Sequence, residues 1–210
     1  MANHSRNHRG FTLVEVVVVI AVVLLLTGIA VPMISGYVED GKRVRAKAEA
    51  NVISSAIASF YKDLAVWPTR NAAGTNNTLY ALYSGKAMPV ANPFLSAHNW
   101  DTWARSATVG DLLDNHLVRN SPQGAIDHGY PTEGEYRWRG PYLPKGSTLD
   151  PWARPYVVFV RSVFDASATN YKKLVVLSAG PDGRIETPYQ ARSNQEISGD
   201  DEGIVLFMRN

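Results

Sequence analysis

An unbroken apolar segment near the N-terminus constrains this chain of 210 residues more than any other feature. It runs from Phe11 to Ile34, and its one charged side chain is Glu15. As a helix rising about 1.5 Å per residue, about twenty of these residues span roughly 30 Å, the thickness of a bilayer's hydrocarbon core. A helix also satisfies its own backbone hydrogen bonds in lipid. The sequence therefore predicts a transmembrane helix over residues 11–34, with a buried core helix as the alternative.

The residues in front of this span indicate its orientation. Residues 1–10 are polar and basic, and Arg6 and Arg9 precede the apolar run. Positive charge favours the cytoplasmic side, so we expect the N-terminus inside and the rest of the chain exported. A basic cluster after the span opposes this asymmetry; it consists of Lys42, Arg43, Arg45 and Lys47. No cleavage site of an ordinary secretory signal clearly follows the apolar run.

A helical pattern continues beyond the span. Between Ser35 and Lys62, apolar residues recur near helical spacing, at Val38, Val44, Ala48, Val52, Ala56 and Phe60. This pattern predicts an amphipathic stem helix over residues 35–62 that continues the anchor and packs on a globular head of residues 63–210. A separate helix after a hinge at Gly36 or Gly41 is the alternative.

The head is expected to combine loops with a small sheet. Trp67-Pro68-Thr69 ends the stem helix, and residues 71–78 form a polar loop. Short helices are predicted over Thr78–Tyr83 and near Val109–Val118. Three segments have the composition of strands: Tyr156–Val163, Lys172–Leu177 and Gly203–Met208. The expected fold class is α+β, with the long N-terminal helix packed on a C-terminal antiparallel sheet of about three strands.

Composition and charge narrow the function. The formal charge is +2, and without residues 1–10 the chain has 19 basic and 19 acidic side chains, so we expect no nucleic-acid partner. The chain has no cysteine, which excludes disulfides, thiolate metal sites and cysteine nucleophiles. It also lacks a P-loop, a Gly-x-Gly-x-x-Gly motif and a serine nucleophile elbow. We therefore expect no enzyme; a signal-anchored periplasmic hydrolase using Asp127-His128 is the alternative from another class.

The boundary between the basic segment and the apolar run carries a recognisable motif. Gly10-Phe11-Thr12-Leu13-Val14-Glu15, with the basic leader before it and the hydrophobic helix after it, resembles the processing signature of type IV prepilins and pseudopilins. The resemblance implies that residues 1–10 are a leader, that a membrane aspartyl peptidase cuts between Gly10 and Phe11, and that the new Phe11 amine is methylated. Without the resemblance, Gly10 would be a flexible joint before a helix.

Glu15 needs its own account, because a charge deep in a bilayer costs about 2.5–3.5 kcal/mol. After cleavage, the Phe11 amine is a cation one helical turn away, and the i,i+4 geometry permits an internal pair. The amine of a neighbouring subunit is a second partner, favoured by the family resemblance as a register device for assembly. A third interpretation places Glu15 in the headgroup zone, where an acid suits the start of a helix.

Motifs in the head sharpen the resemblance toward the major pseudopilin of type II secretion. They are Trp67-Pro68-Thr69, Gly140-Pro141-Tyr142-Leu143, Asp150-Pro151-Trp152, the loop Leu177–Gly183 and Asp200-Asp201. Ala153 replaces the usual glycine, the segment between Gly183 and Asp200 is longer than usual, and residues 70–138 have no counterpart. Conventional type IV pilins often carry a C-terminal disulfide, which this chain cannot form.

This resemblance implies a structural subunit of a periplasmic pseudopilus. The subunit would be anchored once in a bacterial inner membrane, with its C-terminal head in the periplasm. Its partners would be further copies of itself, other pseudopilins, the prepilin peptidase and the inner-membrane secretion platform. A minor type IV pilus or competence pseudopilin is the alternative within the family.

The resemblance also implies calcium in the last loop. Calcium takes about 6–8 oxygen ligands. Asp182, Asp200 and Asp201 would supply charge, and the Leu177 carbonyl and Ser178 would complete the set. The alternative is that Asp182-Gly183 is a simple turn and residues 199–201 are a solvated loop.

Overall fold

The computed structural model describes residues 10–87, 109–164, 173–187 and 197–208. Its contacts divide the chain into two compact units, residues 1–41 and 42–210. The longest element, α1 (Leu13–Leu64), begins in the first unit and ends in the second, so the predicted anchor and stem are one uninterrupted helix. The helical backbone continues through Gly28, Pro32, Gly36 and Gly41.

In the first unit the apolar side chains of α1 are open to the surroundings. They range from Val16, which is 46% exposed, to Leu13, which is 80% exposed. By length and composition this helix is able to cross a membrane. A continuous apolar surface of this extent is rare on a soluble monomer and marks a membrane or protein contact. The segment therefore fits a single-pass membrane anchor, as predicted.

In the second unit, one face of α1 is buried against the head. The buried stripe repeats every three or four residues and consists of Ala46, Ala50, Ile53, Ile57, Phe60 and Leu64, together with Ala56. The alanines at its start let the helix lie close to its neighbours. Val44 and Val52, which belong to the apolar pattern predicted for the stem, are 71% and 58% exposed and lie outside this stripe.

The helix ends two residues later than predicted. Ala65 follows in the left-handed conformation, with a φ of 54°, and its amide donates to the Tyr61 carbonyl at 2.8 Å. Pro68 then prevents a further helical turn. Residues 71–78 form the predicted polar loop, in which the Asn71 side chain accepts the amides of Ala73 and Thr75.

A mixed sheet of five strands lies against the helix, in the order β2-β1-β3-β4-β5. The strands are β1 (Ala81–Tyr83), β2 (Gly110–Leu112), β3 (Val157–Phe159), β4 (Lys173–Ser178) and β5 (Glu202–Met208). The pair β1–β2 is parallel and the other three pairs are antiparallel. The three predicted C-terminal strands are confirmed as β3, β4 and β5, although β3 is shorter and a 3-10 turn, η4 (Arg161–Val163), follows it.

Of the two short helices predicted in the head, one is a strand and the other is only partly helical. Thr78–Tyr83 is not a helix, because Ala81–Tyr83 pairs with β3 on one side and β2 on the other. The segment near Val109–Val118 begins as strand β2 and turns into a short helix, α2 (Leu113–Leu117). Two 3-10 turns follow, η2 (Pro122–Gly124) and η3 (Ile126–His128).

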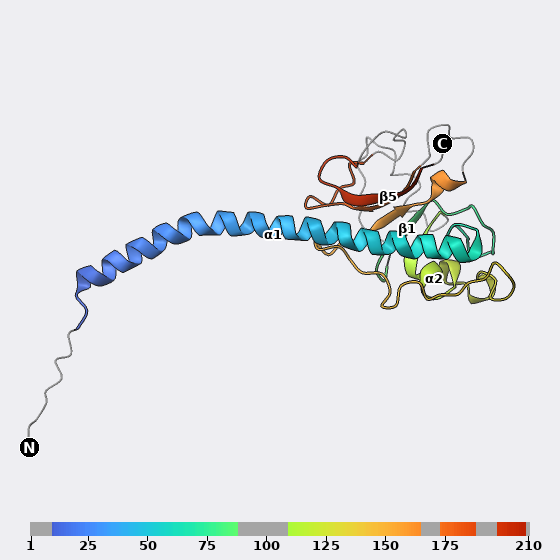
Figure 1. Ribbon diagram of the computed structural model, residues 1–210, viewed down its shortest axis with the longest axis horizontal. Coiled ribbons are helices and arrows are strands. Elements are labelled where there is room, and N and C mark those ends of the chain that lie inside the picture. The colour runs from blue at the N-terminus through green and yellow to red at the C-terminus, as the bar shows by residue number, and fades with distance from the viewer. Residues whose placement is uncertain (1–9, 88–108, 165–172, 188–196, 209–210) are drawn as a thin grey trace, which may run out of the picture. The chain divides into compact units, whose positions relative to one another are not determined.

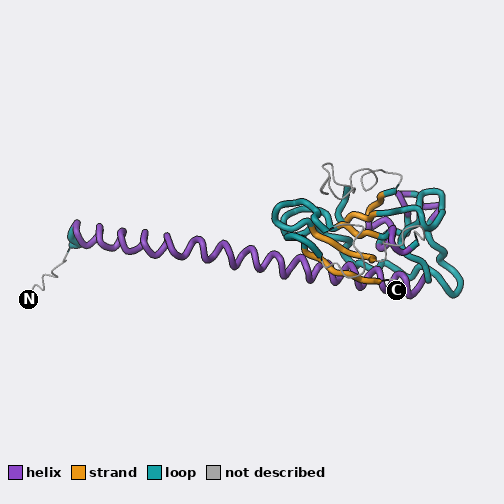
Figure 2. The backbone as a smooth tube through the Cα atoms, turned by 90° about the horizontal axis from the view of Figure 1, so that it is seen from above, coloured by secondary structure: helices purple, strands orange, loops and turns teal. Residues whose placement is uncertain are grey.

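The sheet is covered on both faces. On one face, the α1 stripe packs with Leu82, Val158, Leu174 and Val176 of the sheet and with Leu113 and Leu117 of α2. On the other face, Tyr83, Phe159 and Leu177 pack with Ala179 and Ile185 of the C-terminal region. Figures 1 and 2 show the later part of α1 running alongside the strands. The helix therefore supplies the cover that the small sheet needs, and the C-terminal region closes the opposite side.

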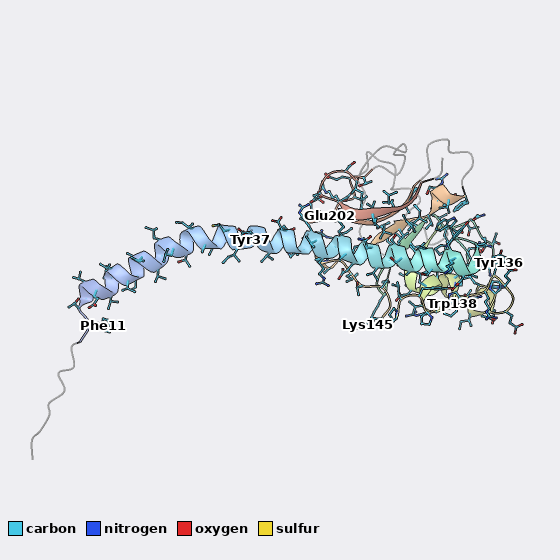
Figure 3. The ribbon with its side chains drawn as sticks, viewed as in Figure 1. Phe11, Tyr37, Tyr136, Trp138, Lys145 and Glu202 are labelled. Carbon is cyan, nitrogen blue, oxygen red and sulfur yellow. The ribbon has the colours of Figure 1, made fainter. Side chains whose placement is uncertain are left out.

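Polar contacts also fasten the helix to the sheet. The Tyr156 hydroxyl donates to the Glu49 carboxylate at 2.7 Å, and burial raises the pKa of this hydroxyl above its ordinary value. Arg43 pairs with Glu202 at the start of β5, at 3.1 Å (Figure 3). Tyr142 donates to Asp63 near the end of α1 at 3.1 Å. These contacts fix the helix to the head at three places, two of them at or beside strands of the sheet.

Candidate functional site

The proposed processing site lies at the start of α1. Thr12 caps the helix, because its hydroxyl oxygen accepts the Glu15 amide at 3.2 Å and its carbonyl accepts the Val16 amide. A threonine three residues before a glutamate is the sequence of a capping box, so the sequence itself carries the signal for this helix start. Thr12 follows the predicted cut, so the cap stays with the mature chain.

The three processing and assembly residues are all accessible. Phe11 is 83% exposed (Figure 3), and the Glu15 side chain is exposed in the first turn of the helix. Among the described residues, nothing lies within 4 Å of the position that a side chain on Gly10 would take. A substitution at Gly10 therefore acts on whatever protein binds this segment and leaves the chain's own fold unchanged.

A second candidate site, which we call the acidic loop, consists of residues 179–187 and 197–201 at the end of β4 and the start of β5. The Asp182 amide donates to Asp200 Oδ2 at 3.3 Å, and Asp182 Oδ1 accepts the Arg184 amide at 2.7 Å. Two of the predicted ligands, Asp182 and Asp200, are thus brought together across the loop, and Asp201 follows directly. Asp182-Gly183 also forms the turn that the alternative interpretation expects.

Asp201 carries the most strongly perturbed carboxyl group of the loop. Its Oδ2 accepts three hydrogen bonds, from the Glu186 amide at 3.0 Å and from the Thr187 amide and hydroxyl at 2.7 and 2.6 Å. Burial nevertheless raises the pKa of Asp201 to about 7, because the negative charge is removed from water and Asp200 adds repulsion. Asp201 Oδ1 and Asp200 Oδ1 are buried without a hydrogen-bond partner among the described residues.

Glu186 is a residue of the acidic loop that sequence reasoning missed. Its Oε2 accepts the Asp200 amide at 3.1 Å. A side chain on Gly199 would overlap this carboxylate, and Gly199 has a φ of 66°, so glycine is needed there for both reasons. Glu186 lies in the segment that is longer than in the resembling family, which is why no motif pointed to it.

The two remaining predicted calcium ligands, Leu177 and Ser178, lie in strand β4. Leu177 is buried in β4, and the Ser178 hydroxyl donates to the buried Asp150 at 2.6 Å. Within the described ranges, no group of three or more Asp, Glu, His or Cys residues is arranged to hold a metal ion. The fit to calcium therefore depends on the two partnerless carboxylate oxygens, which are hard anionic donors of the kind calcium takes.

A buried polar cluster holds together the part of the head that has no counterpart in the resembling family. His116 is fully buried, with Nε2 2.9 Å from Asp111 and Nδ1 2.8 Å from the Tyr130 hydroxyl. Asp111 also accepts the Asn115 amide group and the Gln123 backbone amide. Burial raises the pKa of Tyr130 above its ordinary value. His116, Asp111, Asn115 and Tyr130 are all buried, so this cluster helps to order the interior of the head.

The aspartate–histidine pair that was considered for hydrolysis lies on the surface. Asp127 and His128 are both exposed in η3.

Comparison with known proteins agrees with the N-terminal motif. Residues 5–31 match the family model described as the prokaryotic N-terminal methylation motif. The fimbrial protein EcpC of Eikenella corrodens is 38% identical over 65 residues, which are 31% of this chain and 42% of that protein. The type IV major pilin protein PilE1 of Neisseria gonorrhoeae is 35% identical over 66 residues, 31% of each chain. The chain therefore spans less than half the length of these relatives, and no solved structure matches it.

The fold and the motif together define a class. A long N-terminal helix with a methylation motif at its start, packed on a small sheet, is the architecture of a type IV pilin-like protein. The chain carries the N-terminal methylation motif and is homologous to type IV pilins over its N-terminal third.

Proposed function

We propose that this protein is a structural, non-catalytic subunit of a periplasmic pseudopilus that helps to drive protein export by type II secretion. Its leader is removed after Gly10 by a prepilin peptidase, Phe11 is N-methylated, and copies assemble through their N-terminal helices. The observation that carries the proposal is the combination, in one chain, of the methylation motif, the apolar anchor helix and a cysteine-free head that contains the acidic loop.

The proposed setting follows from the same features. The anchor supports a location in the inner membrane with the head in the periplasm, where other pseudopilins and the inner-membrane secretion platform would be its partners. The first forty residues alone fit any filament of this family. The absence of cysteine supports the pseudopilus in particular, because the C-terminal disulfide common in conventional type IV pilins cannot form.

A pilus subunit is the second candidate, and the comparisons favour it, since both relatives are named as fimbrial or pilin proteins. Deletion of the gene separates the two. A pseudopilus subunit is required for protein release, so the deletion strain should lose proteins from the culture supernatant and retain its surface fibres. The full chain supplied in trans should restore release. Loss of surface fibres with an unchanged supernatant would contradict the pseudopilus and favour the pilus subunit.

We also propose that the acidic loop binds calcium. Asp182, Asp200 and Asp201 would hold the ion, with the Leu177 carbonyl completing the set. Ser178 was predicted to complete the set as well, and its hydroxyl donates to Asp150. The support is the two partnerless buried oxygens and the raised pKa of Asp201, because both identify negative charge that the described residues do not neutralise. Bound calcium would supply that positive charge and order the loop.

The raised pKa of Asp201 sets the pH dependence of this site. A carboxyl whose pKa is higher in the folded state than in the unfolded chain favours folding while it is protonated. That contribution is complete below about pH 4 and is lost as the pH rises through about 7. In a chelator, the melting temperature of the full chain in detergent micelles should therefore fall between pH 5 and pH 8. Calcium at pH 8 should raise it by about 5–10 °C at a hundredfold excess over its dissociation constant.

Two variants make this test specific. Asp201→Asn removes both the pH effect and the calcium response, because the amide imitates the neutral acid. Asp182→Ala removes the calcium response and retains the pH effect. A wild-type melting curve that is the same in calcium and in chelator at pH 8 would exclude a metal from the loop.

A further inference from the structure

An arginine from a neighbouring turn reaches into the acidic loop. Arg154 donates through Nη1 to the carbonyls of Gly180 and Pro181, and through Nη2 to the Pro181 carbonyl at 3.2 Å. One guanidinium group thus forms hydrogen bonds with two consecutive backbone carbonyls of the loop. Backbone carbonyls drawn together around a positive charge are also the arrangement in which proteins bind calcium.

The turn that carries Arg154 is itself firmly held. Asp150 Oδ1 accepts the amides of Trp152 and Arg154 at 3.0 and 2.8 Å, and its Oδ2 accepts the Ser178 hydroxyl at the end of β4. Ala153 adopts a φ of 63°, a left-handed conformation that explains why glycine is usual at this position in the resembling family. Asp150 therefore ties together β4, the turn and the arginine.

The loop leaves room for the guanidinium. A side chain on Gly183 would come within 2.5 Å of Arg154 Cζ, so the arginine lies directly against the bare backbone of this glycine. Gly183 also has a φ of 79°, and its amide donates to the Ala179 carbonyl at 3.1 Å. Two features of the structure therefore favour this contact: the Arg154 side chain is directed at the loop, and Gly183 has no side chain in its way.

We propose that Arg154 is a resident cation of the acidic loop. Its guanidinium holds the carbonyls of Gly180 and Pro181 and supplies fixed positive charge to this backbone and to that of Gly183, so the loop keeps its shape in the absence of a metal ion. Calcium then adds to an organised loop. The statement about calcium rests on the calcium site proposed above. The role of Arg154 in shaping the loop is independent of that proposal.

The test compares full-length variants in detergent micelles, in chelator and in calcium. Arg154→Met keeps the length of the side chain and removes its charge and donors. In chelator, its melting temperature should fall by about 5 °C, and amide exchange in the peptide 178–187 should be about tenfold faster. Calcium should raise the melting temperature of this variant about twice as much as that of the wild type. Arg137→Met, at an exposed arginine of another loop, is the control and should change neither quantity.

The outcomes distinguish the two proposals. Wild-type exchange and melting of Arg154→Met in chelator would overturn the role of Arg154. Should this variant fail to fold, Arg154→Lys gives the same test, because an ammonium lacks the fork that reaches both carbonyls; wild-type exchange in the lysine variant would overturn the proposal equally. The absence of any calcium response in all variants would reject the calcium site alone, since the effect of Arg154 is read in chelator.

Discussion

Replacing Gly10 with valine is expected to abolish removal of the leader. The resemblance places Gly10 on the leader side of the cut, and a β-branched side chain there would obstruct the cleft of the peptidase. The substitution has no other consequence that we expect, because no residue that the structure describes lies within 4 Å of the new side chain. The measurement is the intact mass of the membrane-extracted protein. The wild type should begin at Phe11 with one added methyl group, and the variant should retain the leader.

The same substitution at Gly28 provides a matched control. This glycine also has open space around it, and it lies within the anchor helix, so Gly28→Val should be cut and methylated as in the wild type. A wild-type protein that retains Met1 or Ala2 in filaments would contradict the processing site. Efficient cutting of Gly10→Val would show that the peptidase does not require glycine at this position.

The N-terminal half of the structure could be predicted because membrane physics leaves few solutions. A run from Phe11 to Ile34 with one charge has to satisfy its backbone hydrogen bonds internally, and only a helix does so within one segment. The stem was predictable from periodicity, but its buried face was not fully so. Val44 and Val52 are as apolar as the buried residues, and the close approach of Ala46 and Ala50 to the head decides which side is covered.

The head was less predictable because its pairing is set by distant partners. Strand β1 has three residues, and its form depends on β3 and β2, which lie far along the chain. The cluster around His116 depends in the same way on Asp111 and Tyr130, whose spacing follows no regular period. Local propensity is a weak guide where tertiary contacts decide the conformation.

The acidic loop was also only partly predictable from the sequence. Asp182 and Asp200 were predicted as calcium ligands through a family resemblance, and in the structure the Asp182 amide donates to Asp200 Oδ2. Glu186 and Arg154 were not anticipated, because loop conformation and glycine clearance place them there. The Thr12 cap was the one part of the candidate sites that a general sequence rule was able to reveal.

Replacing Glu15 with valine is expected to leave membrane insertion and cleavage intact and to reduce filament yield at least about tenfold. Insertion should not suffer, because removal of the charge relieves a penalty of about 2.5–3.5 kcal/mol. Assembly should suffer, because the Phe11 amine of a neighbouring subunit loses its counter-charge. The loss of about 1.4 kcal/mol at one contact already changes an association constant tenfold, and every subunit of a filament repeats the contact. The measurement is the amount of sheared filament, compared with cleavage and membrane fractionation.

Three further variants decide which property of Glu15 matters. Glu15→Gln keeps the size and removes the charge, so it should resemble Glu15→Val if a charge pair holds the subunits. Glu15→Asp keeps the charge on a shorter side chain and should be milder. Thr12→Ala removes the cap from the Glu15 amide and retains the carboxylate. If the acid acts only by stabilising the start of the helix, Thr12→Ala should reduce the yield as much as Glu15→Gln, because loss of a cap costs about 1 kcal/mol. Wild-type yield from Glu15→Gln would reject the pairing between subunits and return Glu15 to the role of a headgroup-zone residue.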